Sequence, residues 1–180
     1  MYAVITIFDE ETNQKIHGIW DGLAKEHIST YGFQVPNRRP HITLASFEKV
    51  PDMQYFSEQL AKFCAGQTVV ELQLSLLGTF LDSRVLGLFP VVTDELYDLH
   101  RNIHQLLSEF KNENSLYRPG KWVPHCTLVN HEKEADLEQA YTYCRTHFSS
   151  FSGQLTEMIV LQFHTSQKIE EIYRFPLCQH

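Results

Sequence analysis

The chain carries the pattern Pro-His-x-Thr-Leu twice, as PHITL and PHCTL, and the two histidines, His41 and His125, lie 84 residues apart. Along a β-strand, residues two apart point to the same face, so each histidine should share a face with Thr43 or Thr127. A pair of histidines can remove one proton and deliver another near neutral pH. Threonine hydroxyls can donate hydrogen bonds to the oxygens of a phosphate. The pattern therefore predicts acid–base chemistry on a phosphodiester.

Strands and helices that would position the two motifs alternate along the chain. An apolar strand is expected at residues 2–8, and Asp9 is placed to cap the helix that follows it. The first motif opens a strand at 41–47, after which a helix and a β-hairpin are expected. The same order then recurs: a helix capped by Thr93, the second motif strand at 125–130, another helix and a closing hairpin.

This recurrence of helix, motif strand, helix and hairpin indicates an internal duplication. We expect one domain, 1–180, made of two lobes of about residues 1–90 and 85–180, called the first and second half below. The predicted fold class is α+β, with two antiparallel sheets and outer helices related by a pseudo-two-fold axis. With that symmetry, the two His–Thr pairs can converge on one point, which gives the repeated motif far more weight than either copy alone.

Composition limits the classes of partner. The chain has 180 residues and a formal net charge of −7, whereas proteins that coat long nucleic acids need a broad basic surface. A nucleotide or short RNA bound in a small positive pocket is therefore the expected substrate. No apolar stretch reaches the roughly 18 residues of a membrane helix. No basic segment precedes the first strand, and the four scattered cysteines form no CxxC pair, so we expect a cytoplasmic protein without disulfides or zinc.

The two H-x-T-Φ strands, each preceded by proline and about half a chain apart, resemble the 2H phosphoesterase superfamily, which includes bacterial 2′-5′ RNA ligase-like proteins. The resemblance extends over nearly the whole chain. It implies a bilobal fold with a central groove, and metal-independent action on 2′,3′-cyclic or 2′-5′ phosphodiesters. It also implies that His41 and His125 are the acid–base pair and that Thr43 and Thr127 bind the phosphate. No cofactor and no metal are expected, and the protein should act as a monomer.

The loops before the motifs offer further candidates. Arg39, Lys121 and Trp122 are predicted to bind substrate, since arginine can clamp a phosphate and an aromatic ring can stack on a base. The alternative is that these are solvated loop residues and that Trp122 packs against its own lobe. Arg38, Tyr117 and Arg118 occupy the same loops. Among the other histidines, His104 is expected near the solvent side of its helix, His100 at the boundary, and His27 in the core or at its boundary.

Three functions remain open at this stage. The first is hydrolysis of a phosphodiester, and the second is reversible 2′-5′ RNA ligation, which the same two histidines would serve by microscopic reversibility. The third is a non-catalytic nucleotide-binding module, although binding alone does not require two proton-transfer groups. Because the two motifs lie in equivalent frames, the sequence does not distinguish the acid from the base.

Overall fold

One antiparallel sheet of seven strands runs through the computed structural model, which describes every residue except 111, 131–133, 166–167 and 180. The strands are β1 (Tyr2–Phe8), β2 (His41–Phe47), β3 (Val70–Thr79), β4 (Val85–Pro90), β5 (Cys126–Asn130), β6 (Phe151–Phe163) and β7 (Ile169–Pro176). Their order is β2-β1-β6-β3-β4-β5, and β7 pairs with β6. The two motif strands, β2 and β5, are therefore the first and last strands of this order, at opposite ends of the sheet.

Four helices cover the sheet, and each predicted cap is present. They are α1 (Glu10–Lys25), α2 (Met53–Gly66), α3 (Asp94–Leu106) and α4 (Glu134–His147), with a short 3-10 helix, η1 (Tyr31–Phe33). The Asp9 carboxylate accepts a hydrogen bond from the N–H of Thr12, and the Thr93 hydroxyl caps α3 in the same way. Within the described part of the chain, no helix combines the length and apolar content that crossing a membrane requires.

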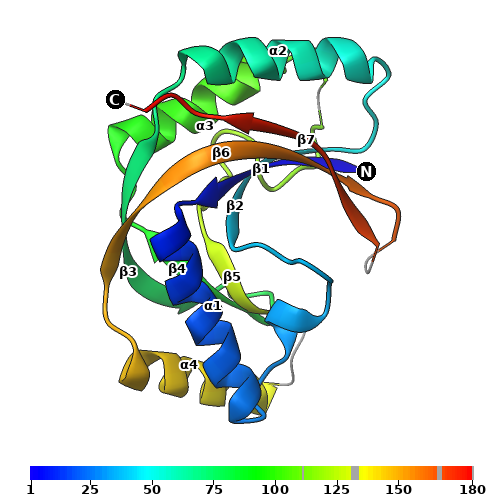
Figure 1. The fold of residues 1–180 in the computed structure, drawn as a ribbon. Helices are drawn as coiled ribbons and strands as arrows, with labels where there is room; N and C mark the ends of the chain where they lie inside the picture. Colours follow the sequence, from blue (N-terminus) through cyan, green and yellow to red (C-terminus); the bar gives the residue numbers. More distant parts are fainter. Residues whose placement is uncertain (111, 131–133, 166–167, 180) are drawn as a thin grey trace.

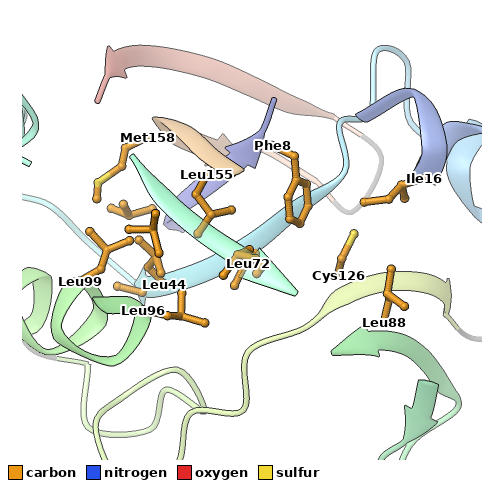
Figure 2. Packing of buried hydrophobic residues seen from close by; sticks show 14 of the residues in the cluster. Phe8, Ile16, Leu44, Leu72, Leu88, Leu96, Leu99, Cys126, Leu155 and Met158 are labelled. Atoms are coloured by element: carbon orange, nitrogen blue, oxygen red, sulfur yellow. The ribbon is translucent and has the colours of Figure 1, made fainter. Parts of the chain in front are cut away.

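The helices are exchanged between the two halves of the chain. In Figure 1, α2 and α3 lie at one end of the molecule and α1 and α4 at the other. The second-half helix α3 packs on β2, whereas the first-half helix α1 packs on β5. In Figure 2, Leu44 of β2 accordingly points towards Leu96 of α3, and Cys126 of β5 points towards Ile16 of α1. Each motif strand is thus held against the core by a helix from the other half.

The predicted α+β fold class is confirmed, and the structure adds one feature to it. The two expected sheets are continuous, because the 13-residue strand β6 pairs with β3 near its start and with β1 further along. The first two predicted strands have the predicted bounds, and the second motif strand begins one residue later, at Cys126. The duplication into two lobes stays a prediction from the sequence.

Both motif strands have a shift in register at the same place in the motif. Ile5 lies opposite Thr43, whereas Val4 lies opposite Ala45, so Leu44 is left without a partner. In β5, Val129 lies opposite Leu86 and Thr127 lies opposite Gly87, so Leu128 is likewise left without a partner. Such bulges bend a strand and change the direction of its side chains, and they are frequent beside active sites. Here the bulge buries both leucines directly after the partly exposed threonines.

Candidate active site

The two motif histidines are held in matching orientations by their own loops. Nδ1 of His41 lies 2.7 Å from the carbonyl oxygen of Arg39, and Nδ1 of His125 lies 2.8 Å from that of Val123. In each case the carbonyl belongs to the residue two positions earlier. A carbonyl oxygen only accepts, so Nδ1 must donate its proton in both rings. The Nε2 atom of each ring is therefore the one available to exchange a proton with a substrate.

Burial disfavours the charged form of both rings in the free protein. Burial lowers the pKa of His41 to about 4, and the positive charges of Arg38 and His125 act in the same direction. Burial also lowers the pKa of His125, although its hydrogen bond to the Val123 carbonyl opposes that change. Strands β2 and β5 contact each other, so the structure brings the two motifs close together.

Each motif threonine lies near a tyrosine from the other half. The Thr127 side chain partly offsets the raised pKa of Tyr31, in the first half, and the Thr43 side chain does the same for Tyr117, in the second half. The two tyrosines are near enough to each other that Tyr117 contributes to the raised pKa of Tyr31, which is due mainly to burial. The site is therefore built from both halves of the chain, and each motif threonine lies beside a tyrosine of the opposite half.

Arg38 brings a positive charge to this site, where it contacts Tyr31. Its Nη1 donates to the Tyr31 hydroxyl at 2.6 Å, and its guanidinium carbon lies 4.1 Å from the centre of the same aromatic ring. The neighbouring Arg39, which the sequence favoured, instead pairs through Nε with Glu171 of β7 at 2.9 Å. In an extended loop, consecutive side chains point in different directions, so only one of the two arginines can face the histidines.

The two other predicted binding residues, Lys121 and Trp122, lie on the loop before the second motif. Lys121 is exposed. Trp122 stacks on His100 with the ring centres 3.9 Å apart, and its Nε1 donates to the backbone carbonyl of Thr43 at 2.9 Å. Trp122 therefore helps to hold the first motif strand in place, and a contact of Lys121 or Trp122 with substrate stays a prediction.

The expected positions of three other histidines are wrong. His100 is only 1% exposed, and its Nε2 lies 2.6 Å from the carbonyl oxygen of Tyr117. His104 is half-buried, with Nε2 3.0 Å from the carbonyl oxygen of Leu44. The cause is the loop after α3, which folds back over this helix and the edge of β2. His27 is exposed, because α1 ends at Lys25.

Aromatic rings pack around His125. The ring centres of Phe80 and Phe89 lie 4.9 Å and 5.7 Å from that of His125. Two paired glycines, Gly78 and Gly87, lie beneath the Phe89 ring. A methyl group at Gly87 would come within 3.1 Å of Phe89 and 3.3 Å of the His125 Cβ, so the absence of a side chain there leaves room for both.

A cavity of about 680 Å³ opens beside His41. Its apolar lining comes from β1, β6, β7 and the loop before β2: Ile5, Val35, Pro36, Leu161 and Ile169. Its charged lining consists of Arg38, Arg39, Glu170 and Glu171. Its volume lies within the usual range of small-molecule sites. Among the described residues, no cluster of three His, Cys, Asp or Glu side chains is arranged to hold a metal ion.

The family model for the 2′-5′ RNA ligase superfamily matches residues 11–167 of this chain. The chain belongs to this superfamily. Its structure is similar to that of E. coli LigT complexed with 3′-AMP, at 19% sequence identity and a TM-score of 0.66, with 99% of this chain and 98% of that chain covered. It is also similar to TT0787 of Thermus thermophilus, at 13% identity and a TM-score of 0.68, with 98% and 97% covered. A comparison with curated proteins finds no match.

These likenesses establish the fold of a 2H phosphoesterase of the 2′-5′ RNA ligase kind. The superfamily assignment agrees with the resemblance that the two motifs carry. The residues that sequence reasoning missed are Tyr31 and Tyr117 as neighbours of the threonines, and one signal could have found them. Each tyrosine ends a Ser-x-Tyr triplet, at 29–31 and 115–117, and the two triplets are offset by 86 residues. That offset nearly equals the 84 residues between the histidines.

Proposed function

We propose that this 2H phosphoesterase hydrolyses 2′,3′-cyclic or 2′-5′ phosphodiesters of nucleotides or RNA ends, and that the reaction needs no metal. The observation that carries the proposal is the matched state of the two motif histidines. Both donate Nδ1–H to a loop carbonyl, so both present Nε2, and the positive charge of His125 helps to lower the pKa of His41. Two such groups are what a phosphodiester needs for proton transfer at both ends of the reaction.

In the proposed reaction with a cyclic phosphate, the oxygen of a water molecule attacks phosphorus. One histidine takes a proton from that water on Nε2, and the other gives its Nε2 proton to the ribose oxygen as the P–O bond breaks. The Thr43 and Thr127 hydroxyls would donate to the non-bridging oxygens, whose negative charge increases in the transition state. Arg38 would neutralise part of that charge from beside His41.

The cavity beside His41 supports a nucleotide as the substrate. Its 680 Å³ would accommodate a nucleoside next to the reacting phosphate, with the apolar side chains of Ile5 and Leu161 beneath the base. Structures of E. coli LigT are known in complex with 3′-AMP, ATP and NADP⁺, each a nucleotide. The net charge of −7 disfavours binding along a long RNA, so we propose that the protein binds a nucleotide or the end of a short RNA.

The test is turnover by the purified protein in EDTA, with 2′,3′-cyclic AMP and 2′-5′-linked oligoadenylate as separate substrates. His41→Ala and His125→Ala should each reduce kcat by about 10²–10⁴-fold, the usual contribution of general acid–base catalysis. His164→Ala is the matched control, because His164 is an exposed histidine at the end of β6 that pairs with Glu170. Full activity in either motif variant would contradict the proposal, as would activity that requires an added metal.

Reversible 2′-5′ ligation is the second candidate, and the matched family supports it by its description. The same two histidines would catalyse the reverse step, with a ribose hydroxyl attacking the cyclic phosphate in place of water. Formation of 2′-5′ linkages from RNA ends that carry a 2′,3′-cyclic phosphate would distinguish ligation. Tight binding of 3′-AMP without any turnover would instead support a non-catalytic module.

A further inference from the structure

Helix α1 contributes two polar side chains, Asn13 and His17, to the lining of the cavity beside His41. They lie four positions apart and therefore share one face of the helix, and the proton transfers described above use neither. We propose that Asn13 selects the base of the substrate by pairing with the edge of an adenine. The inference rests on the proposed function, because that function places a nucleoside in this cavity.

The Asn13 side chain differs from its polar neighbours on α1. Gln14 donates to the Glu10 carboxylate at 2.8 Å, one turn earlier in the helix. Lys15 pairs with Glu11 at 2.7 Å in the same way. Among the described residues, the amide of Asn13 has no hydrogen-bond partner, although the residue is half-buried at the cavity wall. Its donor and acceptor groups are therefore available to a molecule in the cavity.

The backbone of α1 gives no reason for an asparagine at this position. Asp9 already caps the helix through the N–H of Thr12. Asn13 is the fourth residue of the helix, where asparagine is less favourable than alanine, glutamate or lysine. Asn37 also lines the cavity, but its φ of 56° is a left-handed conformation that asparagine adopts more readily than most residues. Of these two asparagines, only Asn13 requires a ligand to explain its residue type.

A carboxamide suits the recognition of a base because it holds a donor and an acceptor side by side in one plane. Adenine presents the matching arrangement, an amino group next to a ring nitrogen, and asparagine pairs with that edge through two hydrogen bonds. The imidazole of His17 has its two nitrogens on separate sides of the ring, so it cannot pair with two adjacent groups. His17 is instead packed edge-on against Trp20, with the ring centres 5.1 Å apart.

The carboxylates of the cavity favour adenine over guanine, because they are already paired. Guanine presents two adjacent N–H donors on one edge, and a free carboxylate has the two acceptors that this edge needs. Both carboxylate oxygens of Glu171 are bonded to arginines, one to Arg39 at 2.9 Å and the other to Arg174 at 3.0 Å. The exposed Glu170 pairs with His164 at 3.1 Å. The cavity therefore offers a guanine no unpaired carboxylate among the described residues.

The test compares kcat/KM for 2′,3′-cyclic AMP with kcat/KM for 2′,3′-cyclic GMP. The wild-type protein should prefer the adenine substrate by about tenfold, the discrimination that one bidentate contact provides. Asn13→Asp replaces the amide with a group that accepts but cannot donate, so it should lose the pairing with adenine and gain pairing with guanine. The ratio of the two kcat/KM values should therefore fall by about 10–100-fold. Asn13→Ala, which the helix tolerates well, should bring the ratio close to one.

Gln14→Glu is the matched control, because it makes the same amide-to-carboxylate change one residue further along α1. Gln14 is exposed and lies outside the cavity lining, so the ratio should keep its wild-type value. The alternative is that Asn13 is an ordinary solvated residue of the helix surface. Equal changes of the ratio in Asn13→Asp and Gln14→Glu, or no change in either, would establish that alternative and overturn the inference.

The outcomes separate this inference from the proposed function. Turnover by the wild-type protein without a preference for adenine would contradict the inference and leave the hydrolase function standing. If the wild-type protein binds nucleotides without turnover, the Kd values of 3′-AMP and 3′-GMP, measured by calorimetry, replace kcat/KM. A preference for 3′-AMP that Asn13→Asp removes would then support the inference and contradict the hydrolase function. Neither turnover nor binding by the folded wild-type protein would contradict both.

Discussion

Trp122 donates its indole N–H to the backbone carbonyl of Thr43 across 2.9 Å, and so joins the loop before the second motif to the strand of the first. The contact is one of three along the outer edge of β2. His104 Nε2 lies 3.0 Å from the Leu44 carbonyl, and the Asn112 amide donates to the Ser46 carbonyl at 3.2 Å. An edge strand normally leaves such carbonyls open to solvent or to another strand. Here side chains of the second half satisfy them and fix the strand that carries His41.

Replacing Trp122 with phenylalanine tests this role. The Phe ring can still stack on His100, but the Thr43 carbonyl loses its donor, which should cost about 1 kcal/mol of unfolding free energy. For a chain of this length that corresponds to a fall in Tm of about 2–4 °C. We expect kcat to fall several-fold with little change in KM, since the residue holds the strand and not the substrate. A large rise in KM with unchanged Tm would support the substrate-binding prediction instead, and Lys121→Ala provides the comparison at an exposed neighbour.

Arg38 and Arg39 form a matched pair for a second prediction. The charge of Arg38 lowers the pKa of His41, because it opposes protonation of the nearby ring. Arg38→Gln should therefore raise the pKa of His41 from about 4 towards the ordinary value, as measured by NMR titration of the imidazole. The same change should reduce kcat/KM by about 10–100-fold, because a charged hydrogen bond to the phosphate is lost.

Arg39→Gln is the control for that experiment. Arg39 pairs with Glu171 on β7, where each side chain is about one third exposed, so its removal should leave the His41 pKa and kcat nearly unchanged. If the two arginine variants behaved alike, Arg38 would have no special place beside His41.

The pH dependence of catalysis gives a third prediction. The active form needs one neutral and one protonated imidazole, so kcat/KM should fall on both sides of a maximum. In the free protein the pKa of His41 is about 4 and that of His125 is lowered from 6.5. As pH rises above these values the acid loses its proton, so the maximum of kcat/KM should lie below pH 6.5. A maximum of kcat/KM above about pH 7 would contradict the burial of both rings.

The kcat profile should lie at higher pH than the kcat/KM profile. A bound phosphate anion stabilises an imidazolium ring beside it and so raises the pKa of the histidine in the complex. Inorganic phosphate should produce the same rise in an NMR titration of the two rings. A titration in which phosphate shifts neither imidazole would show that the anion does not bind between them.

Much of this architecture could be predicted because its determinants are local. The motif strands are marked by alternation between exposed and buried positions, and the caps at Asp9 and Thr93 are marked by residue type and position. The motif histidines can be proposed from the sequence because their pattern recurs. For the strands and the caps, the residues within a few positions of the feature are enough to predict it.

The remaining features depend on which distant segments meet. The repeated Ser-x-Tyr triplet marks Tyr31, but it does not indicate that Tyr31 lies near Thr127, because that depends on the exchange of helices between the halves. His100 looks like a boundary residue on its helix, yet it is buried by a loop that has no periodic pattern to reveal its path. Likewise, the sequence Arg38–Arg39 does not indicate which side chain faces the histidines. These relationships follow from the topology, and residue types constrain them only weakly.

The last prediction concerns the glycine beneath His125. At Gly87, an added methyl group would lie 3.1 Å from the Phe89 ring and 3.3 Å from the His125 Cβ, both closer than ordinary contact. Gly87→Ala should therefore displace one or both rings and destabilise the fold by about 1–3 kcal/mol, the usual cost of overpacking. Because His125 moves, kcat should fall by more than the loss of folded protein explains.

Gly18→Ala in α1 is the matched control, since nothing lies within 4 Å of its added methyl, and the helix should gain up to about 1 kcal/mol. Circular dichroism melts and kcat measured well below Tm separate the two effects, and an active Gly87→Ala protein would show that His125 does not depend on this packing.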